Sequence, residues 1–376
     1  MEKVRVGDIA TLINGDRGKN YPSQADITDE GDIPFVNAGH LNGRNIDFEE
    51  MNYISQDKYK RLSSGKFVKG DVLYCLRGSL GKKAIVNDDV EGAIASSLVI
   101  IRPNYDRIDG DYLMFSLDSP SIKEQLNKAN NGSSQPNLSA ASVREYQIEL
   151  PDLKKQKDIV KKLVKTRSII DSRQHEIDLL DELIKARFVE LTERANTIPT
   201  RMGDIATYVN GYAFKPEQWE DNGYPIIRIQ NLNDANAPYN YYSGDLAEKY
   251  LIHNGDVLVS WATHLEAYIW KGREAWLNQH IFKAVFDKMY VDKTYYVYAC
   301  EEALRQAFRN AHGFKPTMEH IKKSDFDAAI VRLPDIETQK EFADFVNQVD
   351  KSKFVVQKSL EEALLLFDSL MQEYFG

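Results

Sequence analysis

The chain has 376 residues, of which 43% are hydrophobic and 28% charged, a balance typical of a globular protein with more than one domain. It has no apolar run near the roughly 18 residues of a membrane span, no apolar signal-peptide segment, and only two cysteines, which exclude a disulfide framework or a structural zinc site. The net charge of −9 argues against a general polyanion binder but permits local basic loops, and we expect a reduced cytoplasmic protein.

Residues 1–151 predict a first α/β domain. Short apolar runs alternate with Gly, Asn, Asp and Pro, which is the pattern of strands joined by turns. The clearest strands are residues 72–76 and 98–101, and residues 111–126 predict a helix.

Residues 152–195 predict the first of two long helices. Asp152 follows a proline and suits the position that caps a helix N-terminus. Seam residues then recur in a strict 4-3 alternation without Gly or Pro, the pattern of a coiled coil. The seam consists of Ile159, Leu163, Thr166, Ile170, Arg173, Ile177, Leu180, Ile184, Arg187 and Leu191.

Residues 196–334 predict a second α/β domain, and residues 335–376 predict the second long helix. The clearest strands of this half are residues 257–259 and 282–286, and residues 294–309 predict a helix. The seam of the second long helix is the first one shifted by a constant. It consists of Phe342, Val346, Val349, Lys353, Val356, Leu360, Ala363, Phe367, Leu370 and Tyr374.

The two halves share short motifs in the same order. The matched segments are 6–11 with 202–207, 14–15 with 210–211, 34–42 with 225–233, 70–73 with 255–258, and 150–153 with 333–336. One short match would mean little, but five in order indicate an internal duplication of about half the chain.

The connection between the halves predicts how the helices run. The first helix ends near Arg194 and the second repeat begins by Arg201, a link too short to return along a helix of about 60 Å. The second helix must therefore run back to bury its seam. We expect an α+β protein with two duplicated α/β domains, joined by two long antiparallel coiled-coil helices with a pseudo-twofold axis.

Four polar residues interrupt the two seams, namely Thr166, Arg173, Arg187 and Lys353. They either set the register of the helix pair at a cost in stability, or they tolerate partial exposure in a two-stranded seam. The sequence leaves both interpretations open.

Catalytic motifs are missing from the sequence. Residues 78–83 lack the earlier Gly and the Ser or Thr after Lys of a phosphate-binding loop. Asp152 and Asp335 each open a long helix, so they predict N-caps rather than a nuclease carboxylate pair. The sequence has no His-Glu-x-x-His, no Cys-x-x-Cys, no histidines at metal-ligand spacing and no Pro-Pro of an adenine methyltransferase loop. We predict a recognition module without its own catalytic or metal site.

The doubled motifs resemble those of one known family. Gly-Asp-Ile-Ala opens each half, Gly-Asp-Val-Leu lies in the middle, and Leu-Pro-Asp-x-x-x-Gln-Lys leads into each heptad helix. This order is similar to that of the specificity subunit of type I restriction–modification systems, over essentially the whole chain. The resemblance implies two target recognition domains, residues 1–151 and 196–334, each reading one of two unlike halves of a split DNA target.

The resemblance also implies partners. The helices would act as a spacer and as a docking surface for two methyltransferase (modification) subunits, and restriction/translocase subunits would join for cleavage. S-adenosylmethionine, ATP and Mg²⁺ would belong to those partners, with no cofactor bound by this chain. The subunit would work without a membrane, in the cytoplasm of a bacterium or an archaeon.

Candidate DNA-binding residues of the first half lie on three polar segments. The loop 77–83 combines three positive charges with two glycines directly after a strand, whereas a solvated hairpin is the alternative. A polar loop at 130–137 and the segment 37–44 have suitable hydrogen-bonding groups. The candidates are Asn37, His40, Asn42, Arg44, Arg77, Ser79, Lys82, Lys83, Ser134, Gln135 and Asn137.

The second half has different side chains at matching places. Trp261 either stacks on a base or belongs to the core, and Gln230 or Asn231 could read adenine. The candidates are Arg228, Gln230, Asn231, Trp261, His264, Gln279, His280, Lys315 and Thr317. Two other functions remain open, a coiled-coil protein-binding scaffold with two ligand-binding domains and a cryptic nuclease.

Overall fold

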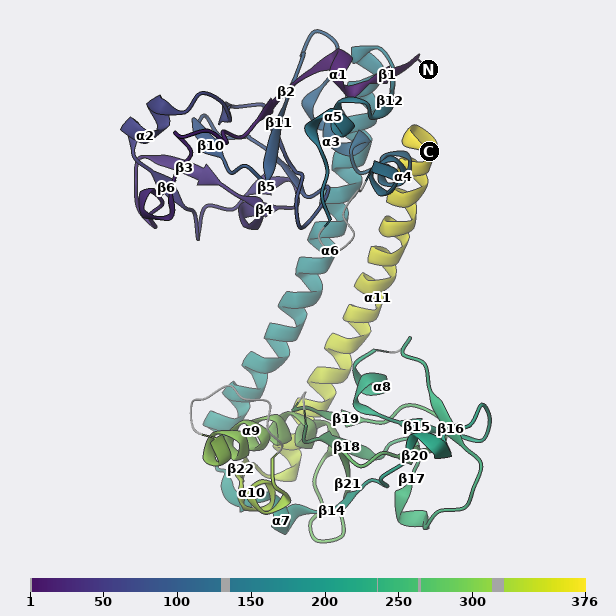
Figure 1. Cartoon of the computed structure of the whole chain (residues 1–376). Coiled ribbons are helices and arrows are strands. Elements are labelled where there is room, and N and C mark those ends of the chain that lie inside the picture. The colour runs from purple at the N-terminus through teal and green to yellow at the C-terminus, as the bar shows by residue number, and fades with distance from the viewer. Residues whose placement is uncertain (1, 130–135, 235, 263–264, 313–320) are drawn as a thin grey trace. The chain divides into compact units, whose positions relative to one another are not determined.

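The computed structural model describes residues 2–129, 136–234, 236–262, 265–312 and 321–376 (Figure 1). The chain forms two compact units, one from Met1–Gln174 with Lys358–Gly376 and the other from His175–Gln357. Each unit therefore contains one α/β domain and a segment of both long helices. No helix in the described parts of the chain is long and apolar enough to span a membrane.

The α/β domain of the first unit is built on two four-stranded sheets and two smaller pairings. The central sheet has the order β2(Ala10–Asn14), β11(Leu98–Pro103), β8(Val72–Cys75), β9(Lys83–Ile85), and every neighbour is antiparallel. The second sheet has the order β6(Tyr53–Ile54), β3(Ile33–Val36), β10(Gly92–Ile94), β7(Lys66–Phe67), with β3 and β10 parallel. The smaller pairings are β1(Glu2–Arg5) with β12(Gln147–Leu150) and β4(Leu41–Asn42) with β5(Asn45–Ile46).

Strand β8 shows why the central sheet forms the core. Its four residues are all buried, and alternate side chains point to opposite faces of a strand. Val72 and Tyr74 join the apolar cluster that includes Leu113, whereas Leu73 and Cys75 join a second cluster on the other face. A sheet buried on both faces explains the uninterrupted apolar run in the sequence.

Short helices surround these sheets. They are α1(Val6–Ile9), α2(Gln56–Arg61), α3(Gly110–Ser116), α4(Pro120–Ala129) and α5(Ala140–Arg144). The prediction of a single helix over residues 111–126 was wrong, because the chain forms α3 and α4 with a break between them. Pro120 begins α4, and proline is favoured at the first turn of a helix but disrupts a helix interior.

The second unit repeats the strand order of the first. One sheet runs β14(Thr207–Asn210), β21(Ile281–Val285), β18(Val257–Ser260), β19(Ala267–Ile269), and another runs β16(Asn240–Tyr242), β15(Tyr224–Ile227), β20(Ala275–Leu277), β17(Leu251–Ile252). Strand β13(Ile198–Arg201) pairs with β22(Ile330–Leu333), and the short helices are α7(Met202–Ile205), α8(Ile229–Asn233) and α10(Lys323–Ala328). The longer α9(Lys293–His312) is continuous. This shared order confirms the duplication at the level of topology.

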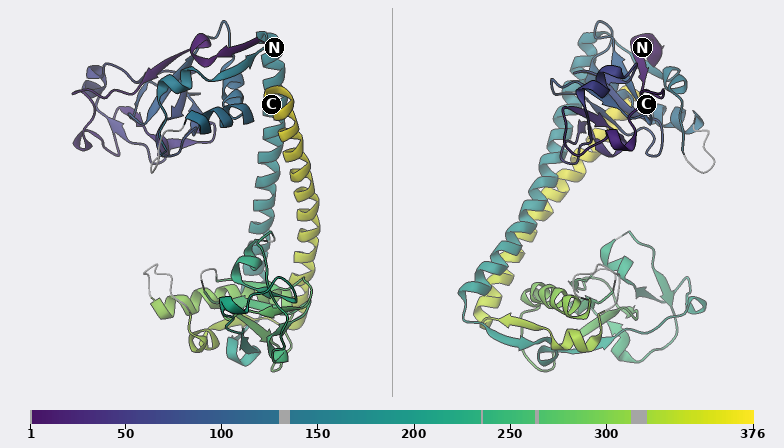
Figure 2. Two further views of the ribbon diagram at one scale, coloured as in Figure 1. Left: turned by 45° about the vertical axis from the view of Figure 1, so that its right-hand side comes forward. Right: turned by 60° about the vertical axis from the view of Figure 1, so that its left-hand side comes forward.

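The two long helices are α6(Leu153–Arg194) and α11(Ile336–Phe375), and they pack antiparallel within each unit (Figure 1). In the first unit, Lys162 Nζ donates a hydrogen bond to the Tyr374 hydroxyl at 3.0 Å. In the second unit, Arg187 pairs with Glu341 at 2.6 Å. Early residues of α6 thus meet late residues of α11, and later residues meet early ones. Figure 2 shows the paired segments from two further directions.

The predicted heptad seam is confirmed by burial, because every seam position of both helices is buried or half-buried. Three of the four polar seam residues, Thr166, Arg187 and Lys353, bond to residues of the two long helices. The Thr166 hydroxyl donates to the Lys162 carbonyl oxygen at 3.0 Å. Lys353 forms an ion pair across the helices with Asp181, as Arg187 does with Glu341. These cross-helix ion pairs favour the interpretation that the polar residues set the register.

Candidate nucleic-acid interface

The repeated Gly-Asp turn shapes the chain just before the central strand of each unit. Gly70 and Gly255 both have φ of 88°, a left-handed conformation that favours glycine. The carboxylate of Asp71 accepts a hydrogen bond from the Val68 amide at 2.9 Å, and that of Asp256 accepts one from the His253 amide at 2.8 Å. The repeated motif is therefore part of the scaffold.

The repeated glutamine fixes the start of each long helix to its domain. Gln156 is fully buried; its side-chain oxygen accepts from the Asp109 amide at 2.8 Å, and its amide group donates to the Pro151 carbonyl at 2.8 Å. Gln339 makes the same two bonds, to the amide of Asp292 at 3.0 Å and the carbonyl of Pro334 at 2.9 Å. The same glutamine thus holds the same framework contact in both units.

The structure brings together two of the loops that the sequence selected in the first unit. Arg77 and Asn137 form an isolated antiparallel bridge. The Gly78 amide donates to the Pro136 carbonyl at 3.3 Å, and the Leu138 amide donates to Leu76 at 2.8 Å. The loop after β8 therefore lies beside residues 136–138, although about 60 residues separate them in the sequence.

The side chains of the loop 77–83 differ in exposure. Arg77 and Ser79 are exposed, and Lys82 is half-buried. Lys83 lies in β9 with a buried side chain, and its ammonium group pairs with Asp118. Burial lowers the pKa of Lys83, and the neighbouring carboxylate opposes this shift. Lys83 is therefore directed into the domain, away from a solvent-facing ligand.

The segment 37–44 is largely occupied with internal bonds. His40 is buried and its Nδ1 accepts from the Asn37 amide at 3.1 Å, while burial lowers the pKa of its imidazole. Arg44 pairs with Asp111, and its guanidinium lies 4.4 Å from the centre of the Phe115 ring. Among the four candidates of this segment, Asn42 at the end of β4 is the exposed one.

In the second unit, Asn231 occupies the position in the repeat that His40 occupies in the first unit. Asn231 is buried, and its side-chain oxygen accepts from the Arg228 amide at 3.1 Å. Its amide group donates to the carbonyls of Ala237 and Pro238, both at 3.2 Å. His40 and Asn231 thus share one structural task, whereas Gln230 beside Asn231 is exposed.

Arg228 and Trp261 are half-buried. The Arg228 guanidinium donates to Asn240 at 3.2 Å and lies 5.2 Å from the Trp219 ring centre. The Trp261 ring stacks on Phe282 with centroids 5.6 Å apart, and its Nε1 donates to the Asn210 side chain at 3.3 Å. This packing favours the core interpretation of the tryptophan.

Gln279 and His280 are half-buried neighbours whose side-chain nitrogens lie 3.1 Å apart. Five candidates lie outside the described residues, namely Ser134, Gln135, His264, Lys315 and Thr317.

A residue that sequence analysis missed lies beside the loop after β8. Arg17 lines the same pocket as Arg77, Asn14 and Asn137, and the pocket has a volume of about 420 Å³. The available signal was the basic residue that follows the repeated Asn-Gly at the end of β2.

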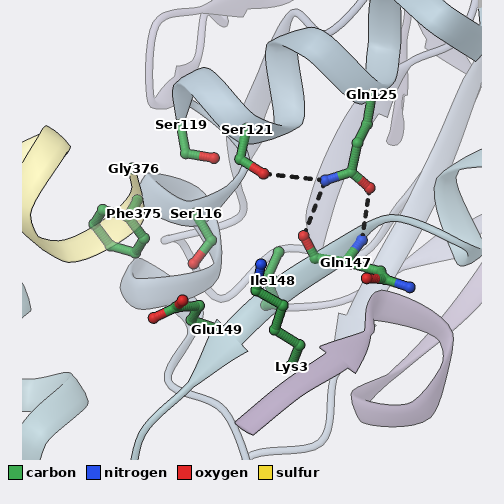
Figure 3. A pocket seen from close by; sticks show the side chains of 10 residues that line it. All are labelled: Lys3, Ser116, Ser119, Ser121, Gln125, Gln147, Ile148, Glu149, Phe375 and Gly376. Carbon is green, nitrogen blue, oxygen red and sulfur yellow. Dashed lines mark hydrogen bonds between the residues drawn. The ribbon is translucent and has the colours of Figure 1, made fainter. Parts of the chain in front are cut away.

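A smaller pocket of about 250 Å³ lies beside α4 and β12 (Figure 3). The Gln125 side chain donates to the Gln147 carbonyl at 3.0 Å and accepts from the Gln147 backbone amide at 2.8 Å. The side-chain amide group of Gln125 is thus bonded within the domain. Among the side chains that line the pocket, Lys3 is the one ammonium group and Glu149 the one carboxylate. No group of three or more His, Cys, Asp or Glu residues suitable for a metal ion occurs in the described part of the chain.

These features define a class of protein, an internally duplicated α/β protein in which each repeat packs on an antiparallel pair of long helices. The chain belongs to the family of the type I restriction modification DNA specificity domain, whose family model matches residues 1–182 and 199–365.

Three specificity subunits are similar to this chain at 20–28% identity. The chain is 28% identical over 158 residues to the EcoBI specificity subunit of Escherichia coli, which covers 40% of this chain and 33% of that subunit. It is 20% identical to the EcoKI specificity subunit of Escherichia coli K12 and to the StySPI specificity subunit of Salmonella potsdam, each alignment covering 98% of this chain and 86% of the relative. The first of these matches thus spans about a third of the relative's length.

Solved structures share the fold. The S subunit of a type I restriction–modification system from M. genitalium has a TM-score of 0.57 at 13% identity, covering 100% of this chain and 96% of that chain. A chain from a study of complex assembly in the type I R-M system has a TM-score of 0.58 at 18% identity, with coverages of 100% and 97%.

Proposed function

We propose that this chain is the DNA sequence-recognition subunit of a type I restriction–modification enzyme, without a catalytic site of its own. It would bind a bipartite double-stranded DNA target with two unlike half-sites. The observation that carries the proposal is the duplication itself: two copies of one topology keep the same scaffold residues and differ in their exposed loops. Different loops on one framework suit different base sequences, since base edges are read by individual side chains.

The DNA-contacting surface would include the exposed candidates. Arg77, Ser79 and Asn42 in the first unit, and Gln230 in the second, are exposed and of types that read base edges or phosphates. Lys82 of the loop 77–83 and Gln279 of the second unit are half-buried and would be further candidates. Lys83, His40 and Asn231 would support the surface from within.

The long helices would dock two methyltransferase subunits, and restriction/translocase subunits would assemble on that complex. Support comes from apolar side chains that the helix pair leaves uncovered, since exposed apolar groups on a helix suit a protein interface. In α6 they are Val164, Ile169, Leu179, Leu183 and Val189, and in α11 they are Phe354, Val355, Leu364, Leu365 and Leu366. S-adenosylmethionine, ATP and Mg²⁺ would bind to the partners, in a bacterial or archaeal cytoplasm.

The test is genome-wide mapping of N6-methyladenine in a methylation-free bacterium that expresses this chain with its neighbouring methyltransferase. We expect one split motif with two unlike half-sites around a fixed gap. If both proteins are soluble and associated but add no methylation, the proposal is wrong and a protein-binding scaffold becomes the better explanation. DNA cleavage by the isolated chain with a divalent metal would instead support a nuclease.

A further inference from the structure

Two arginines of the first unit share a recess whose described lining residues include no Asp or Glu. Arg17 follows β2 and Arg77 follows β8, and both line the pocket of about 420 Å³ described above. Both residues are exposed. Neither forms an ion pair within the described residues, and residues 130–135 contain no Asp or Glu. Two cations without a carboxylate stand out in a chain with 57 acidic and 48 basic residues.

The backbone around both arginines is held in place. Next to Arg17, the Asp16 carboxylate accepts from the Gly18 and Ser63 amides, each at 2.8 Å. The Arg17 guanidinium donates to the Ser96 carbonyl at 3.3 Å. On the other side, the Arg77 carbonyl accepts from the Cys75 thiol at 3.1 Å, in addition to the bridge with Asn137. A fixed backbone with an accessible charged head is preorganised to bind a ligand.

The chemistry of the recess suits one base in particular. A guanidinium presents two parallel N–H donors that match the O6 and N7 acceptors of guanine in the major groove. Asn14 and Ser139 border the same recess and supply neutral polar groups.

The second unit lacks this pair. Counting from the repeated Asn-Gly and Gly-Asp-Val-Leu motifs, Ala213 stands in the place of Arg17 and Ala262 in that of Arg77. Ala262 is 2% exposed, and the Trp261 indole bonds to Asn210, the counterpart of Asn14. The two units therefore differ at this place by two positive charges.

We propose that Arg17 and Arg77 form a guanine-reading pair that specifies a G·C base pair in the half-site bound by the first unit. This inference rests on the proposed function as a DNA-recognition subunit. It adds the base that is read, a second residue that reads it, and the half-site to which it belongs.

The experiment compares the wild-type chain with Arg77→Ala, Arg17→Ala and Arg77→Lys, each expressed with the methyltransferase for methylation mapping. We expect Arg77→Ala to leave one G·C position of one half-site unspecified while the other half-site stays unchanged. Arg17→Ala should relax the same position. Arg61→Ala is the matched control, because Arg61 is exposed at the end of α2 and does not line the recess.

A binding measurement separates base reading from phosphate contact. Labelled duplexes carry the mapped motif, either intact or with that G·C pair replaced by A·T. The wild-type complex should prefer the intact duplex about tenfold or more, since one bidentate pair discriminates to this extent. Arg77→Ala should lose the preference, and Arg77→Lys should lose most of it while keeping the salt dependence of binding. Circular dichroism checks that each variant is folded.

Several outcomes would overturn the inference. Equal weakening on both duplexes with a smaller salt slope would make Arg77 a phosphate contact. Relaxation at an A·T pair, or in both half-sites, would also contradict it. These results would leave the split motif of the wild type, and with it the proposed function, intact. A wild type without any motif would remove both.

Discussion

Buried polar side chains determine how the variable loops of the first unit are held. Asp16 is 5% exposed, and its carboxylate accepts bonds from the Gly18 amide and from the amide and hydroxyl of Ser63, each at 2.8 Å. These bonds hold the pKa of Asp16 below its usual range, with the Gly18 bond first among the causes. One short side chain thus connects two loops that are about 45 residues apart in the sequence.

We predict that Asp16→Asn destabilises the first unit by about 1–3 kcal/mol, because an amide nitrogen would face the Ser63 amide and a hydrogen bond to a charged group would be lost. The folded pKa lies below the unfolded one, so the stabilisation is present above about pH 4 and is lost as the pH falls through the folded pKa. Chemical unfolding measured from pH 7 to pH 3 should therefore show that the free energy of unfolding falls less with decreasing pH in the variant than in the wild type. Asp29→Asn, at an exposed carboxylate, is the control.

The buried glutamine at the start of α6 leads to a second prediction at this scale. Gln156→Ala should cost about 1–3 kcal/mol, since the Asp109 amide and the Pro151 carbonyl would lose their partner. Hydrogen exchange at the Asp109 amide should become faster. Lys157→Ala changes the exposed neighbour in the same motif, and an equal effect there would contradict the role of the buried side chain.

At the scale of the element, the long helices have two different apolar surfaces. The seam is covered by the partner helix, whereas Phe354 and Leu365 of α11 are 72% and 71% exposed. Ion pairs such as Lys353 with Asp181 occupy the edge of the seam and fix which turns face each other. The uncovered surface is thus available to a partner while the helix pair stays intact.

We predict that Phe354→Ser weakens the association with the methyltransferase by tenfold or more while thermal unfolding of the free chain changes little. An exposed side chain contributes little to the stability of the free chain. Burying its aromatic ring in an interface, in contrast, favours association. Analytical ultracentrifugation or calorimetry measures the association. Lys358→Ser, at an exposed position of the same helix, should have a small effect; equal losses in both variants would point away from an apolar contact.

At the scale of the whole molecule, the proposed function makes the helix pair a ruler between two half-sites. Inserting one heptad into each helix, after Gln174 and after Gln357, would keep the 4-3 seam and add about 10 Å. Since ten base pairs span about 34 Å, we expect the unread gap of the methylated motif to grow by about three base pairs.

Methylation mapping measures that gap directly. An insertion in only one helix is the control, because it puts the two seams out of register and should abolish methylation. A motif whose gap stays the same after the paired insertion would refute the role of the helices as a ruler.

The sequence by itself determined the duplication, the two long helices and their seam, because these depend on periodicity and on motifs that need no knowledge of distant neighbours. The prediction of one helix over residues 111–126 failed for a local reason. Pro120 begins a new helix at a place where the apolar pattern continues.

Only the tertiary structure decided which polar residues face inward. Lys83 is paired with Asp118, 35 positions away, and His40 and Asn231 bond to backbone that only the folded turn brings near. It also brought Arg17 next to Arg77, although 60 positions separate them in the chain. Composition and spacing select side chains that are able to bind DNA. Whether such a side chain is free to do so depends on the segments that pack beside it, and those come from elsewhere in the chain.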